Sequence, residues 1–289
     1  MNDTTPEAVS KGEPADSRLG QILLETGKIK DRDVEQILHL AKKKGLHFGE
    51  AAVKLKLTTR DDIEHALARQ FQYPYLREGE GGFGKELVAA YKPFTPKVEA
   101  LRVLRSQLML RWFSAGHKSL AIVSSGRHEG RSYLAANLAV VFSQLGDRTL
   151  LVDADLKYPR QHQIFRLENS PGLSPTLVGR TSGKLVVCGI PQFKNLSILP
   201  AGTPPPNPDE LLARDELEQI RTQLIAEYDV VIFDTPAGTT GGGAEIVASR
   251  CGGALMVARR NRTSLSDARA FTERLRSRTE WVGSVLNRF

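Results

Sequence analysis

The stretch that most constrains the fold is an octet at residues 125–132, SGRHEGRS, which lies between an apolar run at 120–123 and an amphipathic segment at 134–145. A strand, a glycine-containing loop and a helix in this order bind phosphate when the backbone N–H groups of the loop and the helix N-terminus face it. The octet departs from the pattern G-x-x-x-x-G-K-[ST] at two positions, with Ser125 for the first glycine and Arg131 for the lysine. Ser132 keeps the hydroxyl that can bind Mg²⁺, and Arg131 keeps the positive charge in a planar shape. By itself the octet fits either a phosphate site or an ordinary turn.

Two further apolar runs end in carboxylates. Residues 150–152 lead into Asp153 and Asp155, and residues 230–233 lead into Asp234. The carboxyl ends of parallel strands meet at one edge of a sheet, in the crevice where such sheets bind ligands, and carboxylates there can hold Mg²⁺. We therefore predict an α/β fold, a P-loop NTPase-like parallel sheet with helices on both faces, that binds a nucleotide.

Composition excludes several other classes of protein. The two cysteines supply neither a disulfide framework nor zinc-ligand spacing, and the polar N-terminus has no apolar core typical of a signal peptide. No apolar run approaches the roughly 20 residues of a membrane span. The net charge of +7 arises in residues 76–289. A solvated helix face explains this excess, and the alternatives are an anionic membrane, an acidic partner or nucleic acid.

The N-terminal part contains an internal repeat. After a polar leader at 1–17, residues 18–41 align with 47–70 at a constant offset, each with a short apolar helix, a turn and a second helix opened by acidic residues. The second helices carry one apolar face each, Val34, Ile37, Leu38 and Ile63, Ala66, Leu67. Neither unit can bury its apolar face alone, so residues 18–76 are predicted to form one small all-α domain.

This repeat resembles the N-terminal domain of type II secretion and pilus-extension ATPases. The first unit matches at Arg18, Leu19, Gly20, Leu23, Gly27, Ile29, Val34 and Leu38, and the second at Gly49, Ile63, Leu67 and Gln70. The repeated unit binds cyclic di-GMP in some members, so the resemblance implies a candidate cyclic di-GMP site. The departures Ala41, His47 and Lys56 favour protein docking or dimerisation instead.

Residues 77–96 are rich in glycine and bounded by proline, which predicts a linker to a second domain at 97–289. The next predicted helix, 97–113, carries Glu99, Arg102 and Arg105 on one side. They form either a solvated ion-pair face or a reciprocal contact between subunits.

Residues 95–289 resemble the kinase domain of bacterial tyrosine autokinases (BY-kinases), in particular the stand-alone form associated with exopolysaccharide chain length. The matching motifs follow the family's order: EALRVLRSQL, SSGRHEGRSYLAANLA, LLVDADLKYPRQHQIF, LPAGTPPPNPDELL, YDVVIFDTP and VGSVLNRF.

The resemblance implies ATP and Mg²⁺ as cofactors and phosphoryl transfer from Mg-ATP to protein tyrosine. It implies a homo-oligomer formed through Glu99, Arg102 and Arg105, and a location in the cytoplasm, at the inner membrane through a membrane-embedded polysaccharide chain-length regulator, with no nucleic acid partner. It also implies roles for the site residues: nucleotide contacts from Ser125, Gly126, Arg127, His128, Glu129, Gly130, Arg131, Ser132, Tyr133 and Asn287; Mg²⁺ ligands Ser132, Asp153 and Asp234; and catalytic roles for Arg131, Asp153 and Asp155.

Three departures keep other functions open. Arg131 replaces the loop lysine, Lys157 replaces the usual arginine after the second motif, and no tyrosine cluster follows the last strand. A kinase-inactive, nucleotide-dependent adaptor is one alternative. A ParA/MinD-like positioning ATPase is another, although such ATPases carry an additional lysine where this chain has Gly126.

Overall fold

A computed structural model describes residues 15–71, 73–77, 79–167, 171–180 and 185–288. The chain divides into two compact units, Met1–Pro74 and Tyr75–Phe289. Most of the predicted leader lies outside the described residues, and the first helix already begins at Ala15.

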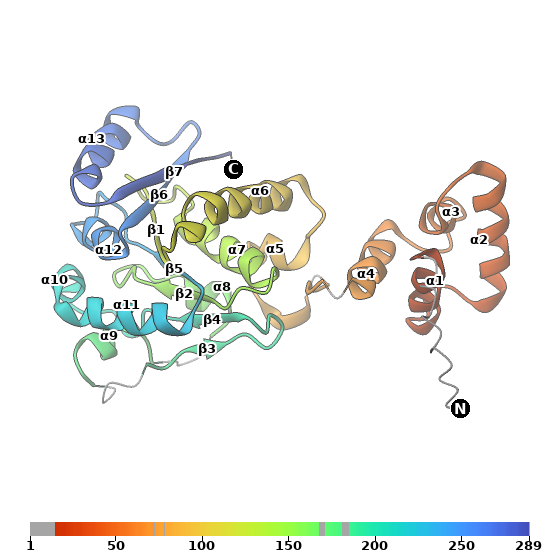
Figure 1. The fold of residues 1–289 in the computed structure, drawn as a ribbon, viewed down its shortest axis with the longest axis horizontal. Coiled ribbons are helices and arrows are strands. Elements are labelled where there is room, and N and C mark those ends of the chain that lie inside the picture. The colour runs from red at the N-terminus through yellow and green to blue at the C-terminus, as the bar shows by residue number, and fades with distance from the viewer. Residues whose placement is uncertain (1–14, 72, 78, 168–170, 181–184, 289) are drawn as a thin grey trace, which may run out of the picture. The chain divides into compact units, whose positions relative to one another are not determined.

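The first unit consists, over its described residues, of helices α1 (Ala15–Glu25), α2 (Asp31–Lys44), α3 (Phe48–Lys54) and α4 (Arg60–Gln70). Each repeat supplies a helix pair, but α1 packs on α4 and α2 packs on α3, so the two repeats exchange partners (Figure 1). Figure 1 draws these helices in red to orange. This exchange explains why one repeat would leave its apolar face in water.

Two glycines at equivalent repeat positions allow this close packing. A Cβ on Gly49 would lie 2.9 Å from Ile63 Cγ2, and a Cβ on Gly20 would lie 3.3 Å from the Phe48 ring. Ile37 and Ile63 are buried as the periodicity predicts, whereas Leu38 is 52% exposed. The predicted apolar face of α2 is thus too wide, because the packing of α2 on α3 leaves Leu38 partly in solvent.

The second unit contains a seven-stranded sheet in the order β3-β4-β2-β5-β1-β6-β7 over its described residues. The central strands are β1 (Ser119–Val123), β2 (Thr149–Asp153) and β5 (Val230–Asp234); the outer strands are β3 (Cys188–Gly189), β4 (Leu196–Leu199), β6 (Gly253–Arg259) and β7 (Glu280–Asn287). All neighbours are parallel except β3 and β4. The predicted α/β class with a mostly parallel sheet is confirmed.

Helices cover both faces of this sheet, as predicted (Figure 1). Helices α6 (Pro96–Arg111) and α7 (Arg131–Ser143) pack on strand residues such as Ile122 and Ile232. Helices α10 (Pro208–Ala213), α11 (Asp215–Glu227), α12 (Gly243–Cys251) and α13 (Leu265–Arg276) pack on the alternate residues, such as Val123 and Phe233. Successive strand side chains point to opposite faces, so apolar runs without alternation supply both cores.

The segment predicted as a linker differs from that prediction. It contains the short helices η1 (Glu80–Gly82) and α5 (Val88–Tyr91), and Leu87 is fully buried in the core of the second unit. Ala89 N–H donates to Asn137 Oδ1 on α7 (2.8 Å). The glycines serve turns with positive φ (Gly79, 98°; Gly81, 72°) and not a flexible spacer.

The remaining short helices are η2 (Phe113–Ala115), α8 (Gln161–Ile164) and α9 (Leu173–Leu177). Among all the helices described, none combines the length and the apolar character needed to cross a membrane.

Candidate functional site

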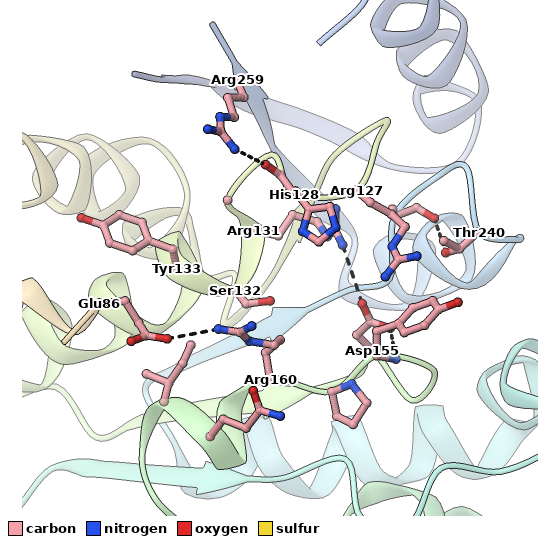
Figure 2. Close-up of a pocket in the computed structure, with 16 residues that line it drawn as sticks. Glu86, Arg127, His128, Arg131, Ser132, Tyr133, Asp155, Arg160, Thr240 and Arg259 are labelled. Atoms are coloured by element: carbon pink, nitrogen blue, oxygen red, sulfur yellow. Dashed lines mark hydrogen bonds and ion pairs between the residues drawn. The ribbon is translucent and has the colours of Figure 1, made fainter. Parts of the chain in front are cut away.

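The predicted phosphate loop joins the end of β1 to the start of α7. Gly130 precedes α7 with φ of 102°, a conformation that favours glycine, and His128 also has a positive φ of 61°. The loop borders a pocket of about 560 Å³ at the carboxyl ends of the parallel strands (Figure 2). The lining residues are Glu86, Arg127, His128, Gly130, Arg131, Ser132, Tyr133, Asp155, Tyr158, Pro159, Arg160, Gln163, Ile164, Ala237, Thr240 and Arg259.

Seven of the residues predicted to bind the nucleotide, bind magnesium or act in catalysis line this pocket, and the other six do not. Arg127, His128, Gly130, Arg131, Ser132, Tyr133 and Asp155 border the cavity. Ser125, Gly126, Glu129, Asp153, Asp234 and Asn287 are not among the lining residues.

Arg131 stands at the position of the loop lysine, and its guanidinium points into the protein. Its Nε donates to the Thr235 carbonyl (2.8 Å) and Nη1 to the Gly126 carbonyl (2.8 Å), with a further short contact to the Ser124 hydroxyl. Its Nη2 lies 3.7 Å from Asp155 Oδ2. Arg131 therefore ties the phosphate loop to the segment after β5, and the planar guanidinium can hold several partners at once.

Glu129 holds the loop from inside. Its carboxylate, 3% exposed, accepts the Gly126 N–H (3.0 Å) and the hydroxyl of Thr263 (2.6 Å). Arg259 Nη1 donates to the His128 carbonyl (3.1 Å), and Asn287 Nδ2 donates to the Glu129 carbonyl (3.3 Å). Asn287, predicted from the family resemblance to contact the nucleotide, thus supports the loop from behind. Sequence reasoning missed Thr263, because an isolated threonine carries no pattern.

Asp153, predicted as a magnesium ligand and catalytic group, is used to build the floor of the site. Its Oδ2 accepts the backbone N–H groups of Arg160 (3.0 Å) and Gln161 (2.9 Å), and its Oδ1 accepts the N–H of Asp155 (3.3 Å). Burial and the neighbouring charge of Asp234 raise the pKa of Asp153 well above its ordinary value. Asp153 therefore orients the start of α8.

Asp234 and Ser132 form the part of the site that fits a divalent cation. Burial raises the pKa of Asp234, while Arg131 and the hydrogen bonds from Ser132 and Gln161 oppose that rise. Gln161 Nε2 donates to Asp234 Oδ2 (2.8 Å), and the buried Asp234 Oδ1 has no hydrogen-bond partner among the described residues. A buried oxygen without a partner beside a serine hydroxyl is a donor set that Mg²⁺ accepts.

Within the described residues, no group of three or more His, Cys, Asp or Glu could hold a metal ion. A magnesium ion at Ser132 and Asp234 would therefore complete its coordination with phosphate oxygens and water, as is usual for this ion. Gln161 belongs to a motif of the resemblance, but its role could be recognised only from its position.

Asp155 lines the pocket, and its pKa is higher than that of an ordinary aspartate. Burial raises its pKa to about 6, and the nearby Arg131 opposes the rise. Its Oδ1 accepts the N–H of Tyr158 (3.0 Å), which leaves the second oxygen toward Arg131. A carboxylate with a pKa near 6 in a pocket can accept a proton from a substrate close to neutral pH.

Three further side chains that line the pocket, Glu86, Tyr158 and Arg160, were not predicted. Arg127 lies over the Tyr158 ring, with its guanidinium carbon 3.9 Å from the ring centroid. Arg160 Nη2 lies 3.1 Å from Glu86 Oε1, so the segment before α6 contributes to the pocket wall (Figure 2).

The predicted oligomerisation residues lie on α6. Arg102 Nη1 pairs with Glu99 Oε2 of the same helix (3.1 Å), and Arg105 Nη1 donates to the Val141 carbonyl at the end of α7 (2.8 Å). Arg105 thus turns toward its own chain, while the carboxylate of Glu99 remains largely exposed.

The fold and site together define a P-loop-type α/β protein with a nucleotide-sized polar pocket. No protein-family model matches the chain. The chain is 34% identical over 214 residues to tyrosine-protein kinase YwqD of Bacillus subtilis (strain 168), covering 73% of this chain and 90% of the relative. It is 32% identical over 200 residues to putative tyrosine-protein kinase CapB of Staphylococcus aureus, covering 68% and 86%.

Solved structures agree with these relatives. The chimerical protein CapA2B2 superposes with a TM-score of 0.67 at 29% identity, covering 78% of this chain and 99% of that one. The kinase domain of Escherichia coli tyrosine kinase ETK superposes with a TM-score of 0.66 at 30% identity, covering 70% and 79%. MinD from Pyrococcus horikoshii OT3, complexed with Mg-ADP, shares the fold alone, with a TM-score of 0.52 at 24% identity over 60% of this chain and 71% of that one.

The chain belongs to the bacterial tyrosine-protein kinases. The resemblance noted in the motifs of residues 95–289 is therefore confirmed, and with it the class of enzyme, protein-tyrosine kinase. The resemblance of the first unit to secretion ATPases stays a prediction.

Proposed function

We propose that this chain transfers the γ-phosphoryl group of Mg-ATP to the hydroxyl of a protein tyrosine. The observation that carries the proposal is the grouping of three side chains where the parallel strands end: Ser132 and Asp155 line the pocket, and Asp234, buried at the end of β5, keeps one oxygen without a hydrogen-bond partner among the described residues. Phosphoryl transfer depends mainly on positioning the reactants and on stabilising charge, and these three side chains are of the types that do both.

The proposed step follows from the positions of these groups. The loop N–H groups and the N-terminus of α7 hold the phosphates, and Mg²⁺, held by Ser132 and Asp234, would neutralise their charge. The tyrosine oxygen bonds to the γ-phosphorus as the bond from that phosphorus to the β,γ-bridging oxygen breaks. ADP leaves, and the hydroxyl proton passes to Asp155, whose pKa near 6 suits it as the base.

The wider role we propose is the control of exopolysaccharide chain length or export, in a complex with a membrane-embedded chain-length regulator. One relative of this chain, 33% identical over 61% of it, is a putative tyrosine-protein kinase in the cps region of Klebsiella pneumoniae. This chain covers 24% of that relative, so the relative carries much additional sequence. We propose that the membrane-embedded chain-length regulator is a separate protein that acts together with this chain.

The experiment is phosphotyrosine detection by mass spectrometry after incubation of the purified full chain with Mg-ATP and a synthetic polypeptide rich in glutamate and tyrosine. Phosphotyrosine is expected on the polypeptide, with more when the membrane regulator is present. Ser132→Ala and Asp234→Asn should lower the rate about 100-fold or more, because each removes a side-chain oxygen that would hold Mg²⁺ against the phosphates. The control is Ser277→Ala, which removes an exposed hydroxyl directly after α13 and should leave the rate unchanged.

Two other outcomes would replace the proposal. Tight nucleotide binding without turnover would identify a nucleotide-dependent adaptor. ATP hydrolysis without phosphotyrosine would identify a positioning ATPase of the kind that shares the MinD fold.

A further inference from the structure

Arginine is unusually frequent around the pocket. Among the described residues, Arg127, Arg131, Arg160 and Arg259 all line it. A transferring phosphoryl group needs at least one cation at its equatorial oxygens, and arginine is well suited because its planar fork matches a phosphate. The hydrogen bonds and ion pairs of each arginine therefore decide which of them can bind the transferring phosphoryl group.

Arg131, at the position of the loop lysine, is the arginine most engaged with the protein. Its side chain is 8% exposed, and its donors are directed at two backbone carbonyls, the Ser124 hydroxyl and Asp155. Moving this guanidinium onto a phosphate would leave the carbonyls of Thr235 and Gly126 without these donors inside the protein, which is costly. Arg131 is held as a support of the loop.

Arg160 has the opposite arrangement, because its backbone is held by hydrogen bonds inside the protein while 53% of its side chain is exposed. Its N–H is held by the buried Asp153, and the next residue, Gln161, donates to both Asp234 and the carbonyl of Ser132. Arg160 is thus anchored directly beside the two groups that fit Mg²⁺, which in P-loop sites bridges the β- and γ-phosphates. In Figure 2 its guanidinium extends along the pocket from this anchor toward Glu86.

The partner of Arg160 can be exchanged at little cost. The pair with Glu86 (3.1 Å) is solvent-exposed, with 53% of the Arg160 side chain and 36% of the Glu86 side chain accessible. Exposed ion pairs contribute little to stability. A γ-phosphate carries more charge than one carboxylate and would compete well for the same guanidinium.

We propose that Arg160 leaves Glu86 and binds the γ-phosphoryl group of the nucleotide, as the catalytic cation that the loop lysine supplies in other P-loop proteins. This proposal rests on the proposed function for the nature of the ligand. Glu86 holds the guanidinium at the pocket mouth until the triphosphate arrives.

The test compares the affinities of ADP and of the non-hydrolysable β,γ-imido analogue of ATP, both with Mg²⁺, by titration calorimetry on the full chain. Arg160→Ala should weaken binding of the triphosphate analogue about 10-fold or more and leave the affinity for ADP within about 2-fold, because a charge-assisted hydrogen bond is lost only to the γ-phosphate. Retained ADP binding also shows that the variant is folded. Arg160→Gln, which keeps polar bulk, should behave in the same way.

Matched variants sharpen the result. Arg250→Ala removes a partly exposed arginine that also pairs with a carboxylate, 3.2 Å from Asp215, outside the pocket, and should change neither affinity. Glu86→Gln releases Arg160 and should bind the triphosphate analogue at least as tightly as the wild type. Equal affinities of Arg160→Ala and wild type for the triphosphate, or an equal loss for both nucleotides, would overturn the proposal.

Phosphotyrosine formation by the same wild-type preparation separates this proposal from the proposed function. An Arg160-dependent preference for triphosphate without phosphotyrosine would overturn the kinase function and leave the contact standing. If phosphotyrosine forms but Arg160→Ala binds the triphosphate analogue as tightly as the wild type does, the kinase function stands and the Arg160 contact is overturned. A wild type that binds neither nucleotide would overturn both.

Discussion

Three aspartates at the same edge of the sheet have different surroundings. Asp153 is saturated by backbone N–H groups, Asp234 keeps one oxygen without a partner among the described residues, and Asp155 lies against Arg131 at the pocket. In the sequence all three are acids that follow an apolar run. The pattern predicts that carboxylates gather there, and hydrogen bonds contributed from α8 and the loop give each a separate task.

The titration of Asp155 makes its role testable. A carboxylate accepts a proton only when ionised, and burial raises the pKa of Asp155 to about 6, so protonation should block the base as the pH falls through 6. We expect kcat/KM for phosphotyrosine formation to fall about 10-fold per pH unit below that value, since kcat/KM reports the free enzyme. Asp155→Asn should be slower by about 100-fold or more at pH 7.5 and should lose this dependence. A wild-type profile that is flat to pH 5 would contradict the assignment.

At the scale of elements, the repeat in the first unit shows how two similar sequences meet one requirement differently. Gly27 ends the turn after α1 with φ of 67°, and Lys56 takes the equivalent place after α3 with φ of 57°. Glycine adopts this left-handed conformation without steric cost, but lysine does not. Lys56 replaces the glycine found at the equivalent position of the first repeat, yet its backbone has the same left-handed conformation as Gly27.

We therefore expect Lys56→Gly to stabilise the first unit. Relief of the left-handed strain should exceed the extra entropy of glycine in the unfolded chain, with a net gain of about 0.5–1 kcal/mol in the free energy of unfolding. Hydrogen exchange of the α3 and α4 amides in the full chain measures it. The control is Lys54→Gly, at the last residue of α3, which has no positive φ to relieve and should not stabilise the unit. Faster exchange in Lys56→Gly would show that the strain argument is wrong.

At the scale of the whole molecule, α6 presents a surface that the single chain leaves exposed. Val103 is 55% exposed and Leu110 is 71% exposed on this helix, which also carries Glu99 and Arg102. Apolar residues beside an ion pair are a composition found at contacts between subunits. Arg105, the third residue of the motif, is used inside the chain at the end of α7, so it would position α6 rather than meet a neighbour.

A charge exchange tests whether this surface joins copies of the chain. Arg102→Glu should lower the fraction of oligomer in sedimentation velocity, because it places like charges beside Glu99 at every junction of a symmetric assembly. Adding Glu99→Arg to that variant should recover much of the lost assembly by restoring opposite charges. Arg111→Glu, at the exposed end of α6 and outside the motif, is the control. A wild type that sediments as a monomer at all concentrations tested would refute the interface.

The sequence by itself determined the fold class, and it predicted a two-part organisation and the edge of the sheet at which the site residues gather. Unbroken apolar strands require cover on both faces, and glycines and acids at strand ends mark the edge where phosphate binds. These are local patterns, and each can be recognised from neighbouring residues alone.

Only the tertiary structure decided which residues do what. It packed residues 79–96 against α7, turned Arg131 into the protein and placed Asn287 behind the phosphate loop. It also brought Glu86, Arg160 and Thr263 to the site from three distant segments. Such roles depend on particular hydrogen-bond partners that lie far apart in the chain, and no local pattern in the sequence marks which side chains will pair.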